Sequence, residues 1–197
     1  MLFAVVVLGC AVVIGYAAGG RLGRLADLDL TRGSLVVGAL VVQAGGGLVG
    51  GAAYPLGLAV SVLLVAVFLG RNRGVRGTGL VALGLLSNAL VVGVNGAMPV
   101  SEAASGRAGI STQDILSGAD PRHELAGRGT HLRWLGDVVP VLLPVHPEVV
   151  SVGDVLVAAG LAQLLVVGMT QGRTRRRPPP PPPTAPPAVI HGRDPRP

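Results

Sequence analysis

Five apolar stretches divide this chain of 197 residues. A helix needs about 20 apolar residues to cross the hydrocarbon core of a bilayer, within a range of about 17 to 25. The third stretch is short, so we expect it to include part of the turn that precedes it. The sequence therefore predicts an all-α integral membrane bundle of about five transmembrane helices. The predicted spans are residues 2–20, 34–53, 56–70, 78–97 and 150–171.

The distribution of arginine predicts the orientation of these spans. The chain has no lysine, so arginine supplies all 16 basic side chains. Twelve of them lie in the first loop, the third loop or the C-terminal tail, and four lie in the long loop before the fifth span. Because arginine-rich loops stay on the cytoplasmic side, we expect the N-terminus outside and the C-terminus in the cytoplasm. Arginines that flank apolar spans, without an aromatic-basic surface, do not indicate a nucleic-acid partner.

Residues 98–149 form the one long loop, which this orientation places outside. Ser111 or Thr112 can cap a short helix that runs through Leu116. The segment 132–145 is apolar, but it is too short and too rich in proline to span a bilayer. We expect this segment to lie at the headgroup level or to be re-entrant.

The C-terminal tail, residues 172–197, is rich in arginine and contains six consecutive prolines. It has no residues that could form a core, so we predict a disordered or polyproline-II tail on the cytoplasmic side. The proline run leaves open a role as a ligand for an SH3-like partner. The arginines before the prolines are expected to bind anionic lipids of the inner leaflet. They are Arg173, Arg175, Arg176 and Arg177.

Four of the five spans place one polar side chain at a similar depth. At about 1.5 Å per residue, each lies about 12 to 15 Å from the cytoplasmic end of its helix. This mid-membrane polar layer has two interpretations: hydrogen bonds between helices, or a path for a small solute or ion. We favour hydrogen bonds, because no span carries a charge at that depth. The layer comprises Gln43, Ser61, Asn88 and Gln163.

A second group of polar residues lies near the outer ends of the fourth and fifth spans. Asn95 and Asp154 are both about 25 Å from the inner side, so we expect them to meet. Together with Asp137 they form a candidate polar outer pocket, roofed by Trp134 and Pro140. The alternative is that both aspartates are helix N-caps, which the glycine before each of them also suits.

The outer loop contains His123, His131 and His146 together with several carboxylates. Three histidines could ligate zinc, but their spacing matches no compact ligand pattern. The sequence offers neither a nucleophile-and-base pair nor a phosphate-binding loop in a usable context. Cys10 is the only cysteine, so no disulfide can form within these residues. We therefore expect no catalytic, cofactor-binding or metal site.

Four short segments carry a resemblance through their order and spacing: Gly20–Leu22, Asn95–Ser101, Leu135–Pro140 and Ser151–Leu156. Together they resemble a bacterial family of multi-pass membrane proteins, domain of unknown function 5317. The resemblance covers roughly residues 1–171. It implies several membrane helices, and it brings no known activity, cofactor or catalytic residue.

These observations favour a structural or accessory component of the bacterial cytoplasmic (inner) membrane that is not an enzyme and that could have a membrane-protein partner. The alternative is a small-solute or ion transporter with a polar path lined by Gln43, Asn88 and Gln163.

Overall fold

The structure is a computed structural model that describes residues 2–28, 30–49 and 53–171. The predicted tail, with the proline run and the four arginines that were predicted to bind lipid, lies outside the described residues.

Five long helices form where the sequence is apolar. Two of them, α4 and α7, are long and apolar enough to cross a membrane, whereas the apolar parts of the other three that the structure describes are shorter: Leu2–Ala17, Ser34–Gly46 and Leu56–Arg71. The mostly helical fold is thus confirmed, whereas a bundle of five membrane spans stays a prediction. The third helix begins within the turn, as expected, with Pro55 in its first turn, where its missing N–H removes no helical hydrogen bond. The helices are α1 (Leu2–Ala17), α2 (Ser34–Val49), α3 (Ala53–Arg71), α4 (Thr78–Asn95) and α7 (Val152–Thr170).

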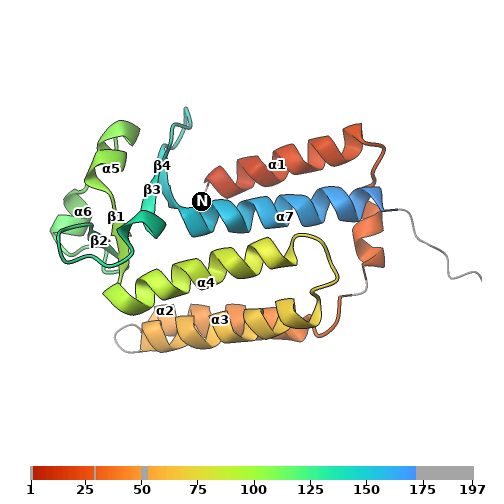
Figure 1. Cartoon of the computed structure of the whole chain (residues 1–197), viewed down its shortest axis with the longest axis horizontal. Coiled ribbons are helices and arrows are strands. Elements are labelled where there is room, and N and C mark those ends of the chain that lie inside the picture. Colours follow the sequence, from red (N-terminus) through yellow and green to blue (C-terminus); the bar gives the residue numbers. More distant parts are fainter. Residues whose placement is uncertain (1, 29, 50–52, 172–197) are drawn as a thin grey trace, which may run out of the picture.

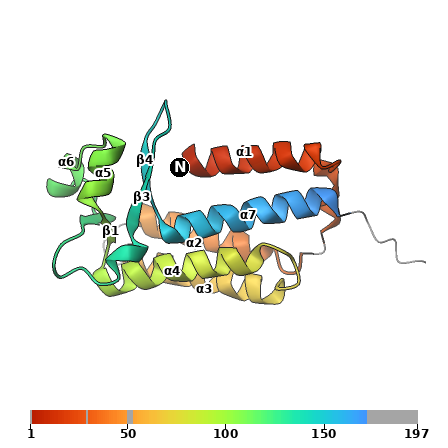
Figure 2. The same ribbon diagram turned by 45° about the horizontal axis from the view of Figure 1, so that its top comes forward.

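These helices lie in an open row (Figures 1 and 2). α1 packs on α7, α7 on α4, α4 on α3, and α3 on α2, so α1 and α2 are at the two ends. The 3-10 helix η1 (Leu22–Asp27) follows α1 and packs on the last part of α7. The last helix in the sequence is therefore an interior member of the row.

Glycines set the packing of α4 against α7. A side chain at Gly84 would collide with the backbone of Gly153, and one at Gly77 would collide with the backbone of Gly160. The two helices run antiparallel and touch through their backbones, as small residues allow. This register staggers them: the start of α4 lies beside the middle of α7, and the end of α4 projects past the start of α7 (Figure 1).

The predicted outer loop forms a small domain with a four-stranded sheet, so the all-α prediction is wrong for this part of the chain. The strand order is β2-β1-β3-β4; β1 pairs in parallel with β2 and β3, and β3 pairs antiparallel with β4. Strands this short depend on partners far away in the sequence, which a local pattern does not reveal. The elements are β1 (Met98–Val100), α5 (Glu102–Ala108), α6 (Gln113–Leu116), β2 (His123–Leu125), η2 (Arg133–Leu135), β3 (Asp137–Val141) and β4 (Glu148–Ser151).

Two details of this domain bear on the predictions. The short helix expected through Leu116 is present as α6. The segment 132–145 supplies η2, β3 and the start of the loop to β4, so most of it belongs to the sheet domain. Gly96 joins the domain to α4, and its φ of 87° lets the chain turn from the helix into β1.

Candidate functional site

The candidate site surrounds the first turn of α7, where the sheet meets the helices. Asp137 lies directly opposite Ser151 in the antiparallel pair of β3 and β4. Ser151 is also the N-cap of α7: its Oγ accepts a hydrogen bond from the N–H of Asp154 at 2.9 Å. The Asp154 carboxylate accepts in return from the N–H of Ser151 at 3.2 Å. This reciprocal capping box joins Asp154 to Ser151, and the strand pairing joins Asp137 to Ser151, so the two aspartates lie close together.

Asn88 of α4 closes this group into a hydrogen-bonded ring. Its Nδ2 donates to Asp154 Oδ1 at 2.8 Å, and its Oδ1 accepts from Ser151 Oγ at 2.8 Å. The Ser151 side chain is fully buried. The Ser151 hydroxyl therefore both donates and accepts a hydrogen bond within the ring. The ring ties the start of α7 to α4.

His123 brings a second carboxylate to Asp137. Its Nδ1 lies 2.7 Å from Asp120 Oδ2, and its Nε2 lies 3.6 Å from Asp137 Oδ2. A protonated His123 would therefore face a carboxylate with each ring nitrogen. Burial raises the pKa of Asp120, but the hydrogen bonds from His123 and from the N–H of Arg122 outweigh burial, and the pKa is lowered.

Asp137 is the most perturbed acid of the site. Its pKa is raised from 3.8 to about 7, chiefly because the residue is buried, with 6% of it exposed. The charge of His123 lowers the pKa and the charge of Asp154 raises it, and both effects are smaller than that of burial. The site can therefore take up or release a proton near neutral pH.

The predicted outer pocket does not form as a unit. Asp137 and Asp154 are brought together, but Asn95 exchanges two hydrogen bonds with the backbone of His131, at 2.8 and 2.9 Å. Asn95 does not reach Asp154 because the stagger of α4 against α7 places Asn88 beside Asp154 instead. Ser151, and not Asp154, is the N-cap of α7, and Asp154 completes the capping box as the third residue of that helix. Asp137 begins a strand, so neither aspartate is the N-cap that the sequence predicted.

Asn95 instead borders a separate hollow of about 240 Å³. This hollow lies between the last turn of α4 and residues 124–131, and its lining includes Glu124 and His131. Trp134, the predicted roof, does not cover a pocket: it is 71% exposed, with the Arg133 guanidinium stacked 4.7 Å from its ring centre.

The predicted mid-membrane layer is also divided. Ser61 Oγ donates to Gln43 Oε1 at 3.3 Å, which joins α2 to α3. Asn88 belongs to the ring at the start of α7. Gln163 is exposed and lies at the level of the start of α4, because its neighbour Leu164 faces Gly77. The depth comparison assumed helix ends at common levels, and the stagger removes that assumption for α4 and α7.

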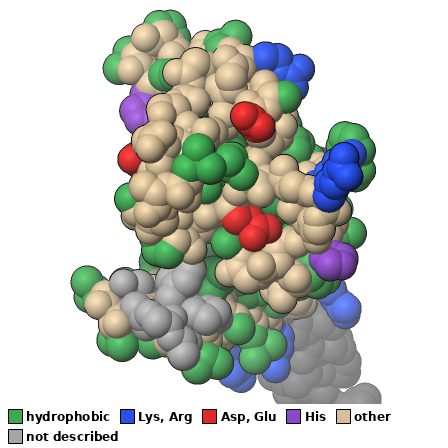
Figure 3. Space-filling model, turned by 90° about the vertical axis from the view of Figure 1, so that its left-hand side faces the viewer, with side chains coloured by type: hydrophobic (Ala, Val, Ile, Leu, Met, Phe, Trp, Pro, Cys, Tyr) green, Lys and Arg blue, Asp and Glu red, His purple; other side chains and the backbone are tan. Residues whose placement is uncertain are grey.

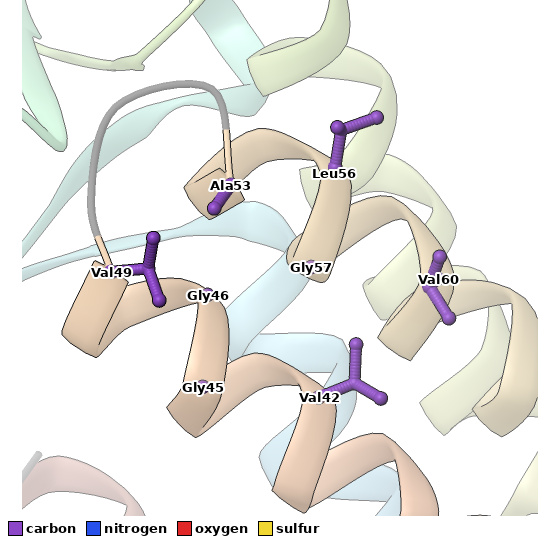
Figure 4. Close-up of a pocket in the computed structure, with 8 residues that line it drawn as sticks. All are labelled: Val42, Gly45, Gly46, Val49, Ala53, Leu56, Gly57 and Val60. Atoms are coloured by element: carbon purple, nitrogen blue, oxygen red, sulfur yellow. The ribbon is translucent and has the colours of Figure 1, made fainter.

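The larger hollow is an apolar groove of about 360 Å³ between α2 and α3. Gly46 and Gly57 face each other at its floor, and Val49 and Leu56 lie along its sides (Figure 4). The close approach of α2 to α3 is thus made through these two glycines.

The three histidines of the outer domain lie in different places. His123 is in the site, the His131 backbone binds Asn95, and His146 Nδ1 lies 3.8 Å from Glu148 Oε1. Within the described ranges, no group of three His, Cys, Asp or Glu residues is placed to hold a metal ion. The end of the molecule that carries the sheet shows acidic, basic and hydrophobic side chains interspersed over its surface (Figure 3).

Three of the segments that carried the resemblance converge on this site: the end of α4 with β1, the start of β3, and the junction of β4 with α7. A family of unknown function, DUF5317, matches residues 28–166. The chain belongs to this family. The match contains the whole site, whereas Gly20–Leu22 precedes it. No curated protein and no solved structure matches the chain.

The DUF5317 match carries no site residues, so the structure identifies the site residues that the sequence analysis missed. The capping box could have been predicted, because Ser151 and Asp154 are three residues apart. The contact of His123 with Asp137 could not have been predicted, because it depends on the sheet that places β2 and β3 on either side of β1.

Proposed function

We propose that the chain is a structural or accessory protein of the bacterial cytoplasmic membrane, with five spans, an N-terminus outside and a C-terminus in the cytoplasm. The observation that carries the membrane location is the exposure of large aliphatic side chains on all five long helices. Examples are Val13 in α1 at 68%, Leu40 in α2 at 62%, Leu63 in α3 at 63%, Leu90 in α4 at 53% and Val155 in α7 at 36%. A protein surrounded by water does not leave so much apolar surface uncovered.

The arrangement of the arginine-bearing loops supports the proposed orientation. Asn72 of the third loop accepts a hydrogen bond from the N–H of Thr31 in the first loop at 2.8 Å. Both loops therefore lie at the end where α7 terminates (Figure 1). Arg24 Nη1 donates to the carbonyl of Met169 at 3.1 Å, which places a positive charge at the C-terminus of α7, where the helix dipole favours it.

The accessory role rests on what the site does with its polar groups. Asn88, Ser151 and Asp154 satisfy one another, and they fix the small domain to the helices. A transport role would need Gln43, Asn88 and Gln163 to line one path, and these residues lie on different parts of the helix row. The geometry therefore favours attachment of the domain over a path across the membrane.

Site-specific labelling of intact cells tests the location and orientation. In a Cys10→Ala background, Ser117→Cys reports on the outer domain and Arg73→Cys on the third loop, and both native side chains are exposed. A membrane-impermeant maleimide should label Cys at 117 in intact spheroplasts, and Cys at 73 only after permeabilisation. Equal labelling of both, or recovery of the protein in the soluble fraction, would contradict the proposal.

Reconstitution separates the accessory role from transport. Proteoliposomes that contain the protein should show the same proton and monovalent-cation fluxes as empty liposomes. A flux that depends on the protein and is lost in Asn88→Ala would overturn the accessory role and favour transport.

A further inference from the structure

The loop between β3 and β4, residues 142–147, lies beside the first turn of α1. Glu148, the first residue of β4, accepts hydrogen bonds from the N–H groups of Leu2 at 2.7 Å and Phe3 at 3.1 Å. This contact fixes the base of the loop at the level where α1 begins. From there the loop projects across the direction of the helices, at the level of the N-terminal end of α1 (Figures 1 and 2).

The tip of this loop is apolar and uncovered. Leu142 is 71% exposed and Val145 is 87% exposed. The sequence from Val138 to Val145 contains no charged or amide side chain. Pro144, within the loop, fixes one backbone φ angle and so reduces the number of conformations that the tip can adopt.

The position of the loop indicates what covers it. The exposed apolar surface of α1 begins with Val5, at 63%, one turn from the contact with Glu148. The proposed orientation puts that turn at the outer boundary of the bilayer. An apolar tip at this level, next to a helix that enters the lipid, meets the boundary between headgroups and acyl chains, where uncharged apolar residues are stabilised.

We propose that the loop 142–147 inserts Leu142 and Val145 into the outer leaflet of the bilayer beside α1. This inference rests on the membrane location proposed above. Since the loop continues into β4 and then directly into α7, its anchoring would hold the sheet against the membrane surface at the edge of the helix row that α1 occupies.

Tryptophan fluorescence can test this insertion, because Trp134 is the only tryptophan of the chain. In a Trp134→Phe background, Leu142→Trp and, separately, Val145→Trp report on the tip. Val13→Trp on α1 is the matched control for lipid, and Leu116→Trp on α6, where the native side chain is 66% exposed, is the matched control for water. Each protein is reconstituted into phosphatidylcholine vesicles with and without brominated acyl chains, and each is also titrated with aqueous acrylamide.

We expect bromine near the headgroup end of the acyl chains to quench about half of the fluorescence at position 142, as suits a side chain about 5 to 10 Å below the surface. Trp at 116 should be quenched by acrylamide and not by bromolipid. If Trp at 13 is quenched by bromolipid while Trp at 142 and at 145 behave like Trp at 116, the insertion is wrong and the membrane location stands. If the tip is shielded from both quenchers while Trp at 13 reports lipid, a protein covers it and the inference fails. If Trp at 13 is not quenched by bromolipid, the proposed membrane location fails as well.

Discussion

Replacing Asp137 with asparagine should remove a pH dependence from the stability of this protein. An aspartate whose pKa is raised to about 7 in the folded state binds a proton more readily there than in the unfolded state. Protons therefore favour the folded state between pH 3.8 and about 7, and the free energy of unfolding falls as the pH rises through this window. An asparagine side chain cannot ionise, and the backbone carbonyl at position 137 can still accept the hydrogen bond from the N–H of Ser101.

The size of the effect follows from the two pKa values. One pKa unit corresponds to about 1.36 kcal/mol, so the shift from 3.8 to about 7 amounts to about 4 kcal/mol when the group is fully ionised. Part of this loss has already occurred at pH 5. Between pH 5 and pH 8 the contribution of Asp137 to the free energy of unfolding should fall by about 2.5 kcal/mol. Between pH 5 and pH 8 the free energy of unfolding of the wild type should therefore fall by this amount relative to that of Asp137→Asn.

The measurement is the free energy of unfolding of purified protein in mixed micelles, with SDS as denaturant, at pH 5 and at pH 8. Comparison of the two proteins at each pH cancels most of the titration of other groups. Asp114→Asn is the matched control, because Asp114 is an exposed acid of the same domain; it should follow the wild type at both pH values. If Asp137→Asn shows the same pH dependence as the wild type, Asp137 is already ionised at pH 5 in the folded protein, and the proposed effect of its burial is wrong.

Three further changes test other contacts. Gly84→Ala should lower the free energy of unfolding by about 1 to 3 kcal/mol, because a methyl group there meets the backbone of α7; Gly93→Ala, with open space around it on the same helix, should be neutral or raise stability by up to about 1 kcal/mol. Asp154→Asn removes a charge that raises the pKa of Asp137, so infrared titration should show that carboxyl group deprotonating at lower pH than in the wild type; an unchanged midpoint would contradict the coupling. Glu148→Gln should weaken the capping of α1 by about 1 kcal/mol and speed hydrogen exchange in its first turn, whereas unchanged exchange would show that the contact contributes little.

The sequence predicted the long helices well and the small domain poorly, for one physical reason. An apolar run of about 20 residues is a local signal, so the start of α4 at Thr78 matched the prediction and its end at Asn95 came close to it. The pairing of Met98 with His123 joins short strands across a long separation, and no periodicity in three residues can reveal it.

The site was predictable to the extent that it is local. The capping of α7 by Ser151 and Asp154 follows from their spacing. The predicted partner of Asp154 was Asn95, but the observed partner is Asn88. The two asparagines lie on the same side of α4, two turns apart, and only the stagger of α4 against α7 decides which of them meets Asp154. That stagger is set by backbone contact at glycines, and a glycine pattern shows that helices approach closely without showing at which level.

The interior position of α7 in the helix row has a consequence for how the chain is made. The helix partner on which α1 packs in the described structure is α7, which is synthesised last of the five. At about 5 to 20 residues per second, about 8 to 30 seconds pass between the synthesis of α1 and that of α7, the helix against which Gly15 packs. During that time α2, α3 and α4 can assemble without it. The arrival of α7 then joins the two parts, because α7 packs between α1 and α4, which are both already made.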